Sequence, residues 1–284
     1  MFRGRLYNTL MGTLFLVATP IGNLEDMSPR AVRILREVKL IAAEDTRHSG
    51  ILLKHFDIHT PIISYFEHNK LTRLEAILAA LALGDVALIS DAGTPAVNDP
   101  GYELVRAALA LGFEVRPVPG PSSPIAALSV SGLPTDAFLY LGYLPHKKSE
   151  RRKLITRVSG SQPTLIFLES PHRLLESLED LLELLGDRPV CVAREMTKLF
   201  EEFWRGQLGD ALAYFRTQPM RGEFTLVVGG NIGQAGGRWT DEDMLAAVRK
   251  ELKSGRSARE ISAELAELGG WSRREVYALV NQNK

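Results

Sequence analysis

The chain has very little cysteine and no long apolar run. Cys191 is the single cysteine in 284 residues, which excludes an internal disulfide and a cysteine-based zinc site. It lies in the apolar run PVCVA, so we expect a small buried core residue. No uninterrupted apolar stretch approaches the roughly 20 residues of a membrane-spanning helix, and no secretory signal is recognisable. These absences predict a cytoplasmic protein with no membrane partner.

The chain also has no excess of positive or negative charge. Lys plus Arg and Asp plus Glu number 34 each, so no global basic field indicates a polyanionic partner. Any nucleic-acid surface must be local. Residues 146–157 (HKKSERRKLITR) and 249–259 (RKELKSGRSAR) concentrate positive charge. The alternative interpretation of each segment is a solvated helix face.

Several familiar site motifs do not occur in the sequence. It has no GxxxxGK[ST] loop, no GxGxxG after the first strand, no GxSxG elbow and no HExxH or CxxC pair. Without loops that cradle phosphate, the chain is poorly suited to ATP or NAD. S-adenosylmethionine has an adenosine and a cationic sulfonium but no phosphate, and Gly and Pro turns expose backbone groups that can hold it.

Three loops rich in proline and glycine are the main feature present. Residues 87–102 (ALISDAGTPAVNDPGY) begin as a buried strand and continue as a dense run of turn formers. Residues 15–23 (FLVATPIGN) and 115–123 (VRPVPGPSS) repeat this pattern. In open α/β sheets ligands bind outside the carboxyl ends of the strands. The three loops are therefore predicted to line one pocket.

Strands and helices alternate along most of the chain. This rhythm predicts a mainly parallel sheet covered on both faces, then a linker at residues 132–136 and a second α/β domain, with a crevice between the domains. Three short helices with a helix-turn-helix outline follow a glycine-rich linker, although any three-helix bundle shows that pattern. The predicted division is an N-terminal extension (1–13), an N-terminal α/β domain (14–133), a second α/β domain (134–232) and a helical tail (240–284).

The loops TPIGN, DAGTPAVNDPG and VPGPSS, in this order, resemble those of the tetrapyrrole methylase superfamily. AEDTR (43–47), FLESPHR (167–173), AREMTKLFEE (193–202), GEFTLVV (222–228) and the tail are similar to its branch of small-subunit (16S) ribosomal RNA cytidine-2'-O-methyltransferases. The likeness covers residues 14–284. Porphyrin-type members have a GxGPG-like first loop and Gly-Asp-Pro in the second, where this chain has ATPIG (18–22) and GTP (93–95). These departures from the porphyrin-type motifs disfavour a tetrapyrrole as the substrate and leave the predicted cofactor unchanged.

The resemblance implies S-adenosylmethionine in the crevice between two α/β domains, and a homodimer. The cofactor contacts that it implies come from the three loops and the second domain: Pro20, Ile21, Thr94, Val97, Ser122, Ser123, Leu168, Ala193, Phe224 and Thr225. The alternative is that the Pro and Gly residues only set turns and that Leu168, Ala193 and Phe224 are core residues.

Transfer of a methyl group to a ribose hydroxyl benefits from a nearby base, because a hydroxyl is a poor nucleophile at neutral pH. The candidate bases are Glu44, Asp45, Asp91 and Asp99. Arg47 is a candidate for holding an RNA phosphate or neutralising a carboxylate. The alternatives are that Asp91 and Asp99 cap turns and that Glu44 pairs with Arg47. This chemistry requires no metal.

RNA is expected on the basic helix and the tail. The candidate RNA-binding residues are Lys147, Lys148, Arg151, Arg152, Arg273 and Arg274, with Tyr65, Phe66 or Tyr143 available for stacking or, alternatively, part of the core. The predicted function is 2'-O-methylation of a cytidine in small-subunit ribosomal RNA, within the assembled subunit or in naked RNA. The other candidates are a methyltransferase acting on a tetrapyrrole or other small molecule, and a non-catalytic RNA-binding assembly factor.

Overall fold

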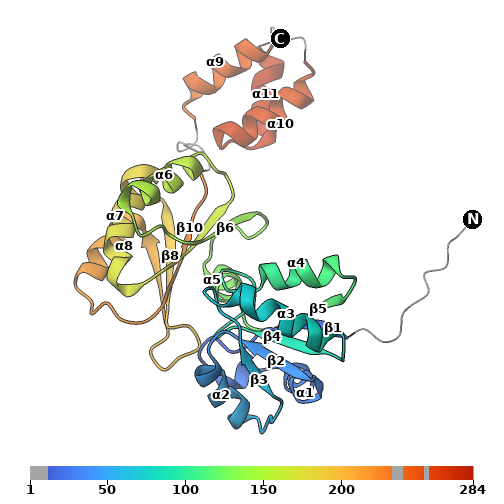
Figure 1. Ribbon diagram of the computed structural model, residues 1–284. Coiled ribbons are helices and arrows are strands. Elements are labelled where there is room, and N and C mark those ends of the chain that lie inside the picture. Colours follow the sequence, from blue (N-terminus) through green and yellow to red (C-terminus); the bar gives the residue numbers. More distant parts are fainter. Residues whose placement is uncertain (1–11, 232–238, 253–255, 284) are drawn as a thin grey trace, which may run out of the picture.

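A computed structural model describes residues 12–231, 239–252 and 256–283. The first part is a five-stranded parallel sheet with strand order β3-β2-β4-β1-β5. It occupies the blue to green part of Figure 1. Its elements are β1 (Thr13–Val17), η1 (Leu24–Asp26), α1 (Pro29–Glu37), β2 (Leu40–Ala43), α2 (Thr46–His55), β3 (Ile62–Ser64), α3 (Lys70–Leu81), β4 (Val86–Ile89), α4 (Tyr102–Ala110) and β5 (Glu114–Val118).

The central strands of this sheet are buried on both faces. Val86 and Leu88 pack in an apolar cluster with α3 and α4, whereas Ala87 and Ile89 pack in a second cluster with α1 and α2. Successive side chains of a strand point to opposite faces, so a sheet covered on both sides needs continuous apolar runs such as VALI. Because the strands are parallel, their three turn-rich loops leave the sheet at one edge.

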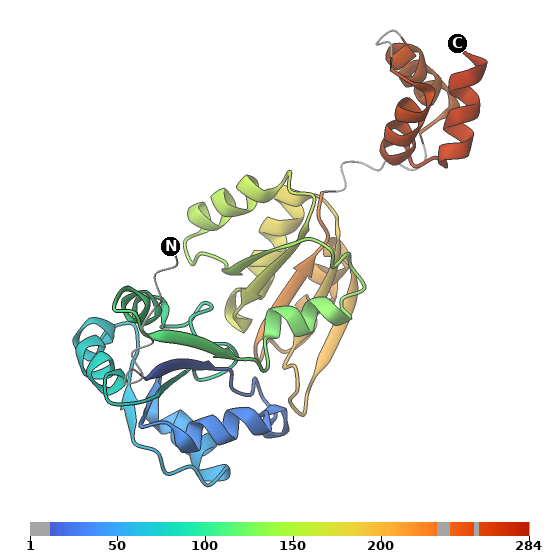
Figure 2. The same cartoon turned by 90° about the vertical axis from the view of Figure 1, so that its right-hand side faces the viewer.

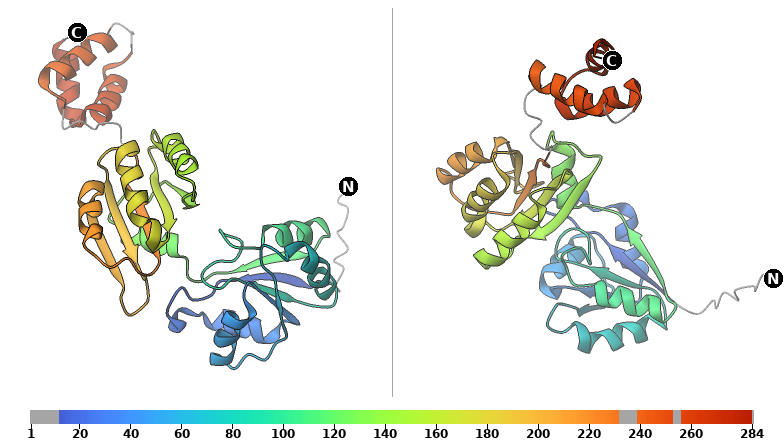
Figure 3. Two further views of the ribbon diagram at one scale, coloured as in Figure 1. Left: turned by 60° about the vertical axis from the view of Figure 1, so that its left-hand side comes forward. Right: turned by 90° about the horizontal axis from the view of Figure 1, so that it is seen from above.

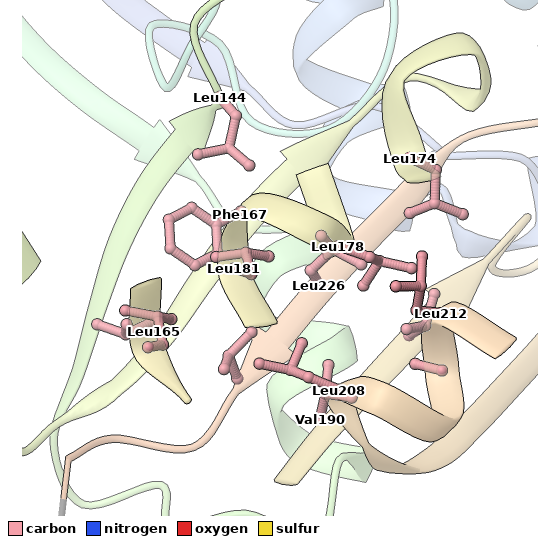
Figure 4. Close-up of a cluster of buried hydrophobic side chains, with 14 of the residues drawn as sticks. Leu144, Leu165, Phe167, Leu174, Leu178, Leu181, Val190, Leu208, Leu212 and Leu226 are labelled. Atoms are coloured by element: carbon pink, nitrogen blue, oxygen red, sulfur yellow. The ribbon is translucent and has the colours of Figure 1, made fainter. Parts of the chain in front are cut away.

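The second sheet also has five strands, in the order β6-β7-β10-β8-β9. Strands β6 and β7 are parallel, whereas β7, β10, β8 and β9 pair in antiparallel fashion. Helices α6, α7 and α8 cover one face over the apolar cluster drawn in Figure 4, which includes Phe167, Leu178 and Leu226. The elements are α5 (Ser123–Val130), β6 (Phe138–Tyr143), α6 (Lys148–Val158), β7 (Thr164–Glu169), η2 (Pro171–Arg173), α7 (Leu174–Leu185), β8 (Pro189–Arg194), β9 (Glu202–Gln207), α8 (Leu208–Arg216) and β10 (Phe224–Val228).

Helix α5 lies between the two sheets in Figure 1. Its residues Ala127 and Leu128 pack with Ile166 and Cys191 on the second sheet, and Ile21 from the first loop joins the same cluster. Cys191 is buried, as predicted. Helix α5 precedes the predicted boundary at residue 133, yet its buried face packs on the second sheet. This cluster therefore joins the two halves beside the crevice.

The tail consists of α9 (Asp241–Leu252), α10 (Ala258–Gly269) and α11 (Arg273–Gln282). Met244, Ile261 and Val276 belong to its own apolar cluster. Reciprocal capping boxes opened by Ser257 and Ser272 begin α10 and α11. The tail, red in the figures, stands beyond the second sheet in every view (Figures 1, 2 and 3). In the part of the chain that the structure describes, no helix has both the length and the apolar character to cross a membrane.

The predicted fold class, two α/β domains followed by a helical tail, is confirmed. Helix α2 and strand β9 were not predicted from the sequence. Helix α2 begins where the sequence shows only a polar run, because Asp45 accepts a hydrogen bond from the backbone N–H of Arg47 and caps a new helix. Strand β9 is an edge strand of the second sheet with partly exposed side chains.

Candidate active site between the two sheets

Three cavities adjoin one another where the loops of the first sheet face the second sheet. The carboxylate cavity, of about 250 Å³, is lined by Glu44, Asp91 and Asp99 among others. The α2 cavity, of about 500 Å³, lies between helix α2 and the first loop. The β10 cleft, of about 50 Å³, lies beside the start of β10. Ile21 and Glu223 line all three, so the cavities meet at these two side chains.

Most residues predicted to contact a cofactor line these cavities. Pro20 lines the α2 cavity and Ile21 all three. The others fall into two groups: Thr94, Val97, Ser122, Ser123 and Leu168 in the carboxylate cavity, and Phe224 and Thr225 in the β10 cleft.

Ala193 is the exception among the predicted cofactor contacts. It is fully buried in β8, opposite Thr225 of β10, and belongs to the apolar cluster with α5. None of the three cavities is lined by Ala193. Its side chain therefore has the position of a core residue, and its contact with a cofactor stays a prediction.

Three of the predicted catalytic carboxylates converge at the carboxyl ends of β2 and β4. The backbone N–H of Asp91 donates to Oε2 of Glu44 at 3.4 Å, and the backbone N–H of Asp45 donates to Oδ1 of Asp91 at 3.1 Å. Asp99 lies further along the loop after β4 and is hydrogen-bonded to the side chain of Ser90. The sequence places these groups far apart, and the parallel pairing of β2 with β4 brings them together.

Asp45 and Arg47 line none of the three cavities, and Arg47 neutralises the carboxylate of Asp45; their catalytic roles stay predictions. Asp45 accepts a hydrogen bond from the backbone N–H of Arg47 at 2.8 Å, and its carboxylate pairs with the guanidinium at 3.1 Å. These bonds from Arg47 lower the pKa of Asp45, which makes it a weaker base. The side chain of Arg47 is 91% exposed, so it remains accessible to a phosphate at the start of α2.

The environment of the carboxylate cavity favours protonated carboxyl groups. Burial, together with the nearby charges of Glu44 and Asp91, raises the pKa of Asp99 to about 6, although the hydrogen bond from Ser90 opposes the shift. Burial also raises the pKa of Glu44. A carboxylate with a pKa near 6 is still ionised at neutral pH and is a stronger base than an ordinary carboxylate. Asp99 therefore has the properties of a general base.

The loop after β4 has an unusual backbone that brings it against the second sheet. Ala96 and Asn98 have φ angles of 66° and 65°, which side chains other than glycine adopt at a cost. A Cβ on Gly142 would lie 2.2 Å from Nδ2 of Asn98, and a Cβ on Gly22 would lie 2.5 Å from Cγ of Lys198. Glycine at these two positions allows loops of the two halves to meet at the edge of the site.

Sequence reasoning missed several residues of the site. Glu223 precedes the predicted pair Phe224 and Thr225. Its place in the motif GEFT (222–225) is the sequence signal that could have identified it. Lys198 lines the α2 cavity and pairs with Glu195 at 2.9 Å and with Glu223 at 3.7 Å. Tyr140 lines the carboxylate cavity, and burial first, then the charges of Tyr143 and Asp99, raises its pKa to about 12. Lys198 lies in the motif AREMTKLFEE (193–202), which was the available signal for it, whereas no sequence signal distinguished Tyr140.

Helix α6 does not present all of its predicted RNA contacts. Arg151 is 1% exposed, and its Nε donates to Asp180 at 2.7 Å. Arg152 pairs with Asp180 at 2.8 Å and also with Glu183. These ion pairs join α6 to α7. Burial removes Arg151 from the predicted RNA contacts, whereas Arg152, 29% exposed, stays a prediction. The basic pattern of α6 does not reveal that its acidic partners lie on α7, the next α-helix along the chain.

The other predicted RNA contacts are accessible. Lys147 and Lys148 at the start of α6 are exposed, as are Arg273 and Arg274 at the start of α11. Of the aromatic candidates for stacking, Tyr65 is fully buried in the core of the first sheet, which corrects its prediction. Phe66 and Tyr143 are exposed by 37% and 53%, so both offer ring surface to a ligand.

Fold and site together define a methyltransferase of the tetrapyrrole methylase type. The family model described as Tetrapyrrole (Corrin/Porphyrin) Methylases matches residues 13–212. The crystal structure of uroporphyrin-III C-methyl transferase from Thermus thermophilus, complexed with S-adenyl homocysteine, has the same fold. The TM-score is 0.54 at 20% identity, over 76% of this chain and 97% of that chain.

Curated relatives define the group more closely. "Ribosomal RNA small subunit methyltransferase I" of a Synechocystis species is 48% identical over 95% of this chain and 97% of that protein. The protein of the same name from Thermotoga maritima is 47% identical over 78% of this chain and 99% of its own length. The chain belongs to the tetrapyrrole methylase family and, within it, to the ribosomal RNA small subunit methyltransferase I proteins. This confirms the family expected from the three loops.

Proposed function

We propose that this chain transfers the methyl group of S-adenosylmethionine to the 2'-oxygen of a cytidine in small-subunit ribosomal RNA. The observation that carries the proposal is the carboxylate cavity, in which loops of the first sheet meet the second sheet around Glu44, Asp91 and Asp99. The names of the relatives support ribosomal RNA as the acceptor. The loop residues GTP (93–95), which replace the Gly-Asp-Pro of porphyrin-type members, favour RNA over a tetrapyrrole.

The residues of the carboxylate cavity and the β10 cleft fit S-adenosylmethionine. Ile21, Val97 and Leu168 offer apolar surface for an adenine ring, and the hydroxyl groups of Ser122 and Ser123 suit a ribose. The anionic carboxylates of the cavity suit a cationic sulfonium. The bound cofactor supplies a methyl group on an activated leaving group.

Asp99 is the proposed general base. Its raised pKa of about 6 and its place in the cavity wall suit the removal of a proton from the ribose 2'-hydroxyl. Burial raises that pKa most, and the negative charges of Glu44 and Asp91 add to the shift. The packed loops on either side exclude water and fix the orientation of the acceptor.

The RNA footprint includes exposed cations on three elements. Arg47 at the start of α2, Lys147 and Lys148 at the start of α6, and Arg273 and Arg274 on the tail are all exposed. The assembled small subunit as acceptor, a homodimeric state and a cytoplasmic location follow from the family resemblance and belong to the proposal. The domain boundaries given above stay predictions.

Transfer of labelled methyl from S-adenosylmethionine to three acceptors in parallel tests the function. The acceptors are naked small-subunit ribosomal RNA, assembled small subunits lacking the modification, and a porphyrin precursor. We expect label in the RNA of assembled subunits that resists alkaline cleavage at the modified linkage, because 2'-O-methylation removes the internal nucleophile. Mapping the label to a cytidine completes the test.

The three acceptors separate the competing functions. Label in the porphyrin precursor alone would replace the proposed function with that of a small-molecule methyltransferase. RNA binding without label in any acceptor would support a non-catalytic assembly factor. Equal labelling of naked RNA and subunits would remove the assembled particle from the proposal and leave the reaction unchanged.

A further inference from the structure

The α2 cavity has no role in the proposed function so far, although it is the largest of the three. It holds about 500 Å³ and shares Ile21, Asp91 and Glu223 with the carboxylate cavity. One wall is helix α2, which contributes His48, Ser49, Ile51 and Leu52. A ligand in the α2 cavity would therefore lie beside the cavity that holds the proposed general base, Asp99, and the proposed cofactor site.

Ser49 is the most informative residue of this wall. It is 2% exposed, and its Oγ has no hydrogen-bond partner among the described residues. A serine within a helix commonly bonds a carbonyl of the preceding turn, but here only the backbone N–H of Ser49 donates to the carbonyl of Asp45, at 2.9 Å. An unsatisfied buried hydroxyl costs free energy. Because Ser49 also lines the α2 cavity, a molecule bound there is the candidate for the missing partner once the side chain turns toward it.

The remaining walls indicate what kind of molecule that is. Ile51, Leu52 and Pro20 give apolar surfaces. Asp91 and Glu223 add carboxylates that disfavour a phosphate, and the charge of Lys198 in the same lining is already paired with Glu195 and Glu223. A flat neutral ring with a hydrogen-bonding edge and an exocyclic amino group matches this lining. The cytosine base of the acceptor nucleotide has these features.

We propose that the α2 cavity is the base subsite of the acceptor nucleotide and that the Ser49 hydroxyl hydrogen-bonds the edge of a cytosine turned out of its stack. This inference rests on the proposed function. Enzymes that modify a base extrude it from the stack, and the same movement of the acceptor nucleotide would bring its base into the α2 cavity. Because the two cavities share Asp91 and Ile21, a base in the α2 cavity leaves its ribose beside the carboxylate cavity.

Two substitutions test the subsite without disturbing the fold. Ser49→Ala removes the unsatisfied hydroxyl, so the unfolding temperature stays the same or rises, while kcat/KM for unmethylated subunits falls about fivefold, as expected for one lost neutral hydrogen bond. Ile51→Asp places a charge on the apolar wall and lowers kcat/KM by at least about tenfold. Cofactor binding, measured by calorimetry, stays unchanged in both variants.

Each substitution has a matched control. Leu83→Asp is made at a similarly exposed residue outside the three cavities, since Leu83 is 71% exposed and Ile51 68%. Ser131→Ala removes a buried hydroxyl that donates to the carbonyl of Leu128 at 2.8 Å. We expect Leu83→Asp to leave kcat/KM unchanged. Ser131→Ala should lower the unfolding temperature and also leave kcat/KM unchanged.

A reconstituted subunit whose acceptor nucleotide lacks its base completes the experiment. With this acceptor the wild type loses activity, and Ser49→Ala causes no further loss, because the contact is already absent. If the wild type labels RNA but Ser49→Ala and Ile51→Asp label it equally well, the base subsite is overturned and the function stands. If the wild type labels no RNA, the proposed function fails, and the subsite fails with it.

Discussion

At the residue scale, the site depends on three carboxylates held closer together than their charges favour. Asp91 and Glu44 share a backbone contact, and Asp99 lies where both of their charges raise its pKa. The same loop contains the strained residues Ala96 and Asn98. Backbone strain and repulsion between like charges both lower the free energy of unfolding, so they persist only where the surrounding structure holds the residues in place. We infer that both are tolerated here because they accompany the placement of Asp99 in the cavity.

Replacing Asp99 with Asn should separate activity from stability. We expect kcat/KM of the wild type to rise with pH through about 6 and then level off, and Asp99→Asn to lower the plateau by about 10² to 10⁴-fold. Asp136→Asn, made at an exposed carboxylate outside the cavities, is the control. A profile without an inflection near pH 6, or full activity in Asp99→Asn, would exclude Asp99 as the base.

The same substitution has a pH-dependent effect on unfolding. The folded pKa of Asp99 lies above its ordinary value of 3.8. Between these values the folded state binds more protons than the unfolded state, so stability falls as pH rises. Asp99→Asn removes this loss, and we expect its unfolding temperature to exceed that of the wild type at pH 8 but not at pH 4. Thermal unfolding at the two pH values measures the difference.

At the element scale, the pair of helices α6 and α7 shows how a charge pattern can mislead. Arg151 is buried against Asp180, so a segment that looks like a nucleic-acid surface is in part an internal ion-pair network. Burial opposes ionisation of Asp180, but the hydrogen bonds from Arg151 and Arg152 outweigh it and lower the pKa of Asp180. The network is therefore charged at neutral pH.

Removing the buried acid of this network should destabilise the second sheet strongly. Asp180→Ala leaves the guanidinium of Arg151 buried with only the exposed Glu176 as a partner, so we expect a loss of about 3 kcal/mol in the free energy of unfolding. Glu183→Ala removes an exposed, solvent-screened partner of Arg152 and should cost much less free energy of unfolding than Asp180→Ala. Urea unfolding of both variants compares them, and equal losses would contradict the role of burial.

Much of the fold could be predicted from the sequence because its signals are local. Continuous apolar runs indicate strands covered on both faces, and the Pro and Gly loops indicate their carboxyl ends. Most of the predicted cofactor contacts line cavities at these loops, and their contact with a cofactor stays a prediction. Helix α2 escaped prediction because its first turn is polar and its helical character depends on the cap by Asp45. Strand β9 is a half-exposed edge strand whose pattern EFWRGQ alternates weakly. The unsatisfied hydroxyl of Ser49 depends on tertiary structure and leaves no trace in the sequence.

At the scale of the whole molecule, the tail is a separable unit. It has its own apolar cluster and capped helices, and it stands apart from both sheets in Figure 2. The Thermotoga maritima relative is matched over almost its full length by about four-fifths of this chain. The described helices of the tail contribute no strand to either sheet. We therefore expect the two sheets to form the site without the tail.

Truncation after residue 231 should leave the cofactor affinity and the unfolding temperature of the two sheets unchanged and weaken RNA binding. Arg273→Ala with Arg274→Ala in the full chain should reproduce that weakening and reduce the slope of log affinity against log salt by about one for each lost phosphate contact. Filter binding to small-subunit RNA across a salt series measures both. Unchanged affinity in the truncated chain would remove the tail from the RNA footprint.

Ile21 links the cavities to the folding of the whole protein. It packs in the cluster that joins α5 to the second sheet, and it also lines all three cavities. A ligand that contacts Ile21 therefore adds to the same contacts that hold the first loop against the second sheet. By mass action, each tenfold rise in the concentration of such a ligand above its Kd adds about 1.4 kcal/mol to the free energy of unfolding. Packing between the two sheets and ligand binding at Ile21 should therefore stabilise each other.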